Sequence, residues 1–87
     1  MSVYVDDLVD YGWAKGPSCH MFGDTPDEVH VLAKRIGLKR EWFQEHRWLP
    51  HYDLVERKRV KAVAAGAVEV DLHFVADRIA AVRGHFS

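Results

Sequence analysis

Three consecutive residues near the middle of the chain, His51, Tyr52 and Asp53, carry an imidazole, a phenol and a carboxylate. The sequence around them predicts a helix from Asp53 to Gly66, because Asp53 and Glu56 have the spacing of a capping box and glycine often follows a helix. The positive end of the helix dipole would then lie beside these polar side chains. Such a position suits a bound anion, a metal ion or a proton transfer.

A second group of polar residues lies in two short segments that have the alternating pattern of β-strands. Residues 3–7 alternate and end with Asp6 and Asp7, which are therefore predicted to point to opposite faces. Residues 18–22 alternate in the same way and contain His20. In open α/β sheets, ligands bind beyond the carboxyl ends of strands, which is where the two acids lie.

Imidazoles and carboxylates together suit a divalent ion such as zinc, manganese or iron, or a shared proton. The metal ligands predicted from the two groups are Asp6, Asp7, His20, His51 and Asp53. The residues predicted to act in acid–base or nucleophilic chemistry are His51, Asp53, Asp7, His20 and Tyr52. The residues predicted to contact an anionic or flat cofactor are Arg59, Arg57 and Trp48. The site requires a fold that brings the first strand's end to the start of the helix.

Hydrophobic periodicity predicts an earlier helix that starts after Thr25. Pro26 suits its first position, and Glu28 has the spacing that completes a capping box with Thr25. Its predicted buried stripe consists of Val29, Leu32, Ala33 and Ile36. Gly37 is predicted to end this helix, and the aromatic segment 38–50 is predicted to be a loop that packs over the core or forms a lid.

The C-terminal third of the sequence predicts a short strand followed by a helix. The strand covers residues 68–71 and is predicted to run parallel to an earlier strand, because a helix connects them. The helix is capped by Asp71 and ends at Gly84, with an inner stripe of Leu72, Val75, Ala76, Ile79 and Val82. The whole pattern predicts a small single α/β domain over residues 1–87, with about three strands and three helices in the order β-β-α-α-β-α.

The composition limits the class of protein further. Cys19 is the only cysteine among 87 residues, which excludes an internal disulfide and fits a reducing cytoplasm. Its neighbour His20 is predicted to point to the opposite face, so the two are not expected to form a nucleophilic pair. No apolar run approaches the roughly 20 residues that span a bilayer, so a cytoplasmic protein without membrane association is predicted. A chain of this length has a thin core that a homo-oligomeric contact would support.

The charges are unevenly distributed along the chain, although the net charge is only −1. Residues 1–33 contain six acids and one base, whereas residues 34–61 contain nine bases and four acids. This asymmetry is consistent with a solvated helix face that complements the acidic segment, and also with an anionic ligand.

An ordered series of short motifs resembles a known family. The series includes Tyr-Val-Asp-Asp at 4–7, Cys-His-Met at 19–21, Asp-Thr at 24–25, Trp-Phe-Gln at 42–44 and His-Tyr-Asp-Leu at 51–54. It resembles the small bacterial and phage proteins of domain of unknown function 4031, from about residue 3 to residue 71. The resemblance implies no activity. The recurrent polar positions that it implies are Asp6, Asp7, His20, Asp24, His51, Tyr52, Asp53 and Arg59.

Three functions are compatible with these features. The first is a small hydrolase or phosphoester-processing enzyme with a metal-binding or acid–base His/Asp site. The second is a binding module for a nucleotide or nucleic acid that uses the tryptophan-containing segment and the bases Arg57, Lys58, Arg59 and Lys61, although the net charge is unusual for that class. The third is a structural or partner-binding protein whose polar cluster only stabilises its loops.

Overall fold

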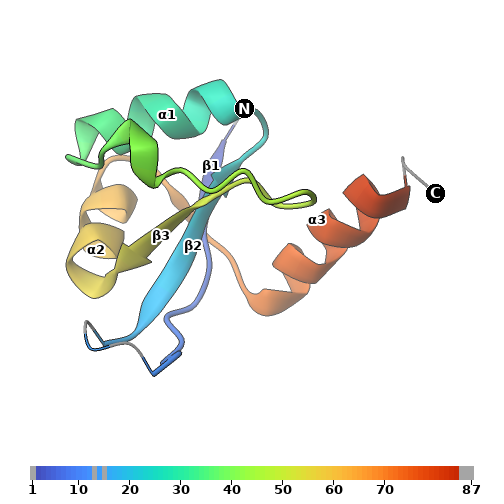
Figure 1. The fold of residues 1–87 in the computed structure, drawn as a ribbon, viewed down its shortest axis with the longest axis horizontal. Coiled ribbons are helices and arrows are strands. Elements are labelled where there is room, and N and C mark those ends of the chain that lie inside the picture. The colour runs from blue at the N-terminus through green and yellow to red at the C-terminus, as the bar shows by residue number, and fades with distance from the viewer. Residues whose placement is uncertain (1, 13, 15, 85–87) are drawn as a thin grey trace.

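The computed structural model describes residues 2–12, 14 and 16–84 (Figure 1). The strands are β1 (Val3–Val5), β2 (Ser18–Gly23), β3 (Tyr52–Val55) and β4 (Val68–Glu69). The helices are α1 (Pro26–Arg35), the short 3-10 helix η1 (Arg40–Trp42), α2 (Glu56–Ala64) and α3 (Leu72–Gly84). The predicted α/β class is confirmed, and the described residues contain β3 in addition to the strands that were predicted.

The strands in this part of the chain form one mixed sheet in the order β3-β2-β1-β4. β2 is antiparallel to both β1 and β3, and β4 runs parallel to β1. The parallel pairing predicted for the last strand is therefore confirmed, with Tyr4 opposite Val68. Because side chains alternate along each strand, the sheet has one face that meets α1 and α2 and another that meets α3 (Figure 1).

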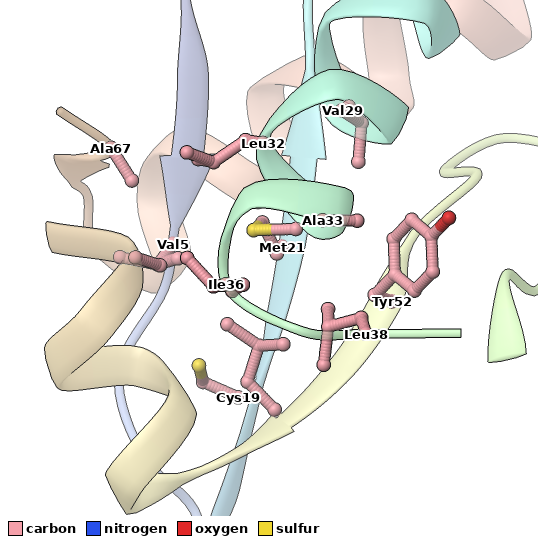
Figure 2. Close-up of a cluster of buried hydrophobic side chains, with 12 residues drawn as sticks. Val5, Cys19, Met21, Val29, Leu32, Ala33, Ile36, Leu38, Tyr52 and Ala67 are labelled. Atoms are coloured by element: carbon pink, nitrogen blue, oxygen red, sulfur yellow. The ribbon is translucent and has the colours of Figure 1, made fainter. Parts of the chain in front are cut away.

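The main core lies between the sheet and the helices α1 and α2 (Figure 2). Val5, Met21 and Leu54 come from three neighbouring strands, and all are fully buried there. The residues of α1 that meet them are Val29, Leu32, Ala33 and Ile36, as the periodicity predicted. Cys19 is buried among these side chains, away from His20, which confirms the predicted divergence of the two residues.

The other face of the sheet carries a smaller core beneath α3. It is built from Phe22, Leu49 and Val75. Asp71 caps α3 as predicted, since its Oδ1 accepts a hydrogen bond from the Phe74 backbone N–H at 2.9 Å. The predicted inner stripe is only partly correct, because Leu72 and Ala76 are exposed while Phe74, Arg78, Ile79 and Val82 are half-buried. No helix in the described part of the chain has the length and apolar character needed to cross a membrane.

The helix predicted to begin at Asp53 begins instead at Glu56, and this prediction was wrong. Residues 52–55 form β3, in which burial alternates, with Tyr52 and Leu54 facing the main core. Pairing with β2 gives this segment backbone partners that a local helix signal does not take into account. The predicted capping box does not form, because the N-cap of α2 is Val55 and makes no side-chain cap bond.

α2 packs on the main core through a small residue. Ala62 is fully buried there, whereas Val60 is 64% exposed. The predicted end of the helix is confirmed at Gly66, whose φ of 110° lies in the left-handed region that favours glycine. Thr25 is the N-cap of α1, but in the described residues it makes no side-chain cap bond, and the carboxylate oxygens of Glu28 are buried without a hydrogen-bond partner.

We predict that Gly23→Ala destabilises the protein by about 1–3 kcal/mol, as overpacking commonly does. A Cβ at this position would lie 2.7 Å from Cγ2 of Val29 and 3.1 Å from the Ser2 carbonyl oxygen. Urea unfolding measures the loss. Gly84→Ala is the matched control, because apart from its chain neighbours and its own helix a Cβ there meets no atom of the described residues within 4 Å. Equal unfolding free energies for both variants would contradict the close packing of β2 against α1.

Candidate metal centre

A row of polar side chains crosses β1, β2 and β3 on the face that α3 covers only in part. His20 lies opposite Asp53 in the register of β2 and β3. Asp6 follows β1 and donates its backbone N–H to the His20 carbonyl oxygen at 3.2 Å. Side chains opposite one another in a sheet share a face, so these three residues are neighbours. His51 lies two positions before Asp53 and therefore belongs to the same face.

Asp6 holds His20 by two hydrogen bonds. Its Oδ1 accepts the His20 backbone N–H at 2.6 Å, and its Oδ2 lies 2.7 Å from Nδ1 of the imidazole. Asp6 is 1% exposed, so its carboxylate is a buried partner of the ring and accepts a hydrogen bond from Nδ1–H. The bond from Asp6 raises the pKa of His20 above its ordinary value, against the effect of burial. When the imidazole is neutral, the bond to Asp6 keeps its single proton on Nδ1, and Nε2 has a free lone pair.

The ring of His51 is fixed by the backbone of its own loop. Its Nδ1 lies 2.6 Å from the Leu49 carbonyl oxygen, which can only accept, so Nδ1 carries the proton and Nε2 has the lone pair. Nε2 lies 3.4 Å from Oδ1 of Asp53. The rings of His51 and His20 are perpendicular, with their centroids 4.8 Å apart. Burial lowers the pKa of His51, which favours its neutral form.

Asp53 is held by Gln44, which belongs to the Trp-Phe-Gln motif but was not predicted as a site residue. The side-chain amide of Gln44 donates to Oδ2 of Asp53, which leaves Oδ1 directed toward His51. Gln44 is positioned by an antiparallel bridge to His51, in which each backbone N–H bonds to the other's carbonyl at 2.8 and 3.1 Å. Asp53 does not cap a helix as predicted, because it belongs to β3.

His20, His51 and Asp53 form the one group among the described residues whose ligand atoms could hold a metal ion. One ligand atom from each lies within 4.8 Å of the others. The side chains of His20 and Asp53 are 27% and 23% exposed, so solvent reaches the group. Two imidazoles and a carboxylate with open positions are a known donor set for zinc and iron. The partners of both Nδ1 atoms resemble the outer hydrogen bonds that orient metal-binding histidines.

Two residues of the predicted site lie elsewhere. Tyr52 points to the opposite face of the sheet, where its hydroxyl lies 2.9 Å from Nδ1 of His30. Its assignment to the cluster followed from the incorrect helix, since in a strand it cannot share a face with its neighbours. Asp7 is exposed and is not part of the group that could hold an ion. Asp6 lies at the site, but as the partner of His20.

The three predicted cofactor-binding residues are dispersed. Arg59 donates from Nε to the Asp6 carbonyl oxygen at 2.9 Å and forms an ion pair with Glu69 at 2.8 Å, so it supports the backbone behind the site. Arg57 is exposed on α2. Trp48 is half-buried in the loop before β3, with the guanidinium groups of two arginines over its ring. These arginines are Arg47 and Arg83.

Fold and site together define a small protein with a mixed sheet and a cluster of two histidines and one aspartate on one sheet face. The chain belongs to the family described as "Protein of unknown function (DUF4031)", whose sequence profile matches residues 3–82. This match covers the motifs of the resemblance and most of α3. Comparisons with curated proteins and with solved structures gave no match.

We predict that the two histidines of the cluster titrate on opposite sides of 6.5, the ordinary imidazole pKa. His20 titrates above it because Asp6 favours the imidazolium, and His51 titrates below it because the ring is buried. The His20–Asp6 pair therefore stabilises the fold fully below about pH 6.5, and this contribution is lost as the pH rises through the raised pKa of His20. NMR titration of the imidazole signals measures both values. A His51 pKa above that of His20 would refute the assignment of partners.

Proposed function

We propose that this protein binds a divalent transition-metal ion through Nε2 of His20, Nε2 of His51 and Oδ1 of Asp53. The observation that carries the proposal is that Nδ1 of each imidazole has an outer hydrogen-bond acceptor: the Asp6 carboxylate for His20 and the Leu49 carbonyl oxygen for His51. In neutral rings this leaves the Nε2 lone pairs available beside a carboxylate oxygen. Zinc, manganese and iron suit such a mixed nitrogen and oxygen donor set.

We further propose that the centre hydrolyses a phosphoester. His20, His51 and Asp53 would hold the ion, which when bound would supply Lewis acidity toward a phosphoryl oxygen or a water molecule. The residues of the chain contribute orientation: Asp6 fixes the ring of His20, and Gln44 fixes the carboxylate of Asp53. The partial exposure of His20 and Asp53 provides the access that a substrate requires.

Metal titration tests the proposed ligands directly. After removal of metal with a chelator, we expect wild-type protein to bind one equivalent of Zn²⁺ or Mn²⁺ in calorimetry. His20→Gln, His51→Gln and Asp53→Asn should each abolish this binding or weaken it by more than tenfold. His73→Gln, an exposed residue of α3, should leave the affinity unchanged. Failure of wild-type protein to bind either ion would refute the metal centre and leave the cluster with a structural role.

Asp6→Asn tests the outer hydrogen bond without removing a proposed ligand. We expect the metal affinity to fall about 10–100-fold, as it does when outer partners of metal-binding histidines are lost. Asp77→Asn, an exposed carboxylate of α3, is the control for the same change of charge. Thermal unfolding without metal shows whether Asp6→Asn remains folded. An unchanged affinity in a folded Asp6→Asn variant would remove the proposed role of Asp6.

Hydrolysis is measured separately with bis(p-nitrophenyl) phosphate and p-nitrophenyl phosphate in the presence of each ion. Activity that depends on the ion, and that is lost in Asp53→Asn but retained in His73→Gln, is the expected result. Metal binding without turnover of either ester would restrict the proposal to metal binding alone.

A further inference from the structure

A second group of polar side chains lies at the edge of the main core, on the sheet face opposite the proposed metal centre. The ring of Tyr52 is buried in that core, and its hydroxyl points away from the apolar cluster (Figure 2). The hydroxyl lies 2.9 Å from Nδ1 of His30, which is on α1. The two polar groups border a cavity of about 280 Å³ that is lined by His30, Lys34, Leu38, Arg40 and Tyr52.

The Tyr52 hydroxyl and the neutral His30 ring together have two polar hydrogens, and the hydrogen bond between them engages only one. Burial, followed by the charge of Arg40, lowers the pKa of His30, so at neutral pH the imidazole carries a single N–H. If the Tyr52 hydroxyl donates to Nδ1, the imidazole proton resides on Nε2. If Nδ1 donates, the hydroxyl proton is free instead. In both cases the pair retains one N–H or O–H group that can donate a hydrogen bond to a ligand oxygen.

Two cations complete the lining of the cavity. Lys34 and Arg40 contribute an ammonium and a guanidinium, and the residues that line this cavity include no carboxylate. Among the described residues, neither cation forms an ion pair with an acid. The charge of Arg40 affects the pKa of His30 more strongly than either the carboxylate of Asp27 or that of Glu45 does.

We propose that this cavity binds a tetrahedral oxyanion, either inorganic phosphate or the phosphate group of a small phosphomonoester. The guanidinium of Arg40 can donate two parallel hydrogen bonds to phosphate oxygens, and the ammonium of Lys34 supplies a second positive charge. The remaining donor of the Tyr52–His30 pair can bind a further oxygen. The site is independent of the proposed metal centre, from which the sheet separates it.

A nearby basic depression provides a matched comparison. It is lined by Arg35, Lys58 and Lys61 together with apolar residues, and the ammonium of Lys58 already donates to the Ile36 carbonyl oxygen at 3.0 Å. Arg35 follows Lys34 directly on α1 but lines this other depression, not the proposed cavity. Replacing Lys34 or Arg35 removes one positive charge at almost the same place in the chain. Comparing the two variants therefore distinguishes binding at the proposed cavity from nonspecific attraction to a basic surface.

The test is calorimetric titration of wild-type protein with sodium phosphate and with phenyl phosphate, at constant ionic strength. We expect saturable binding of one equivalent, and the tighter of the two ligands identifies whether the site favours free phosphate or a phosphomonoester. Lys34→Gln and Arg40→Gln should each raise the Kd about tenfold or more, as the loss of a charge-assisted hydrogen bond does. Tyr52→Phe should also raise it, whereas Arg35→Gln should not.

Three results would overturn the proposal. The first is the absence of saturable binding in wild-type protein. The second is an equal loss of affinity in Arg35→Gln and Lys34→Gln, which would indicate diffuse attraction. The third is binding that disappears in Asp53→Asn but persists in Arg40→Gln, which would place the anion at the His/Asp cluster. Thermal unfolding in sodium chloride confirms that the variants are folded. Arg40 and Lys34 are exposed, so their replacement is not expected to disturb the core.

Discussion

The arrangement of the site depends on the burial of one charge, the carboxylate of Asp6. An ionised group with almost no solvent contact must have hydrogen-bond partners, and Asp6 obtains two from the backbone and the ring of His20. These bonds set the orientation of the imidazole. The register of β2 and β3 then places Asp53 beside the same ring. The bonds of Asp6 and the register of β2 and β3 together set the geometry across three neighbouring strands.

The buried faces of α1, β1 and β2 were predicted correctly from the local sequence. The stripe of α1 has helical spacing, and β1 and β2 alternate with period two, so their buried faces follow from the residues themselves. β3 was missed because Asp53 and Glu56 imitate a capping box. What makes the segment a strand is its pairing with β2, a contact between residues far apart in sequence.

The site, too, was predicted where residue types in the local sequence were enough and was not predicted where contacts between distant residues decide. Asp6, His20, His51 and Asp53 were identified by residue type, and all four lie together. Their separate roles could not be predicted, since the bond between Asp6 and His20 depends on the register of two strands. The support of Asp53 by Gln44 depends on a bridge within an irregular loop, for which the sequence has no periodic signal. Tyr52 was misplaced because a strand, unlike a helix, alternates its neighbours between faces.

The position of β1 between β2 and β4 has a consequence for the order of assembly during translation. β1 is synthesised first, whereas β4, its parallel partner, emerges only after α2. Contacts between such distant segments form slowly, because a long loop must close. The row from Asp6 to Asp53 lies on β1, β2 and β3, which are all synthesised before β4, whereas the support of the Asp6 backbone by Arg59 and Glu69 requires α2 and β4. The arrival of β4 then covers an edge that would otherwise be open to pairing with another chain.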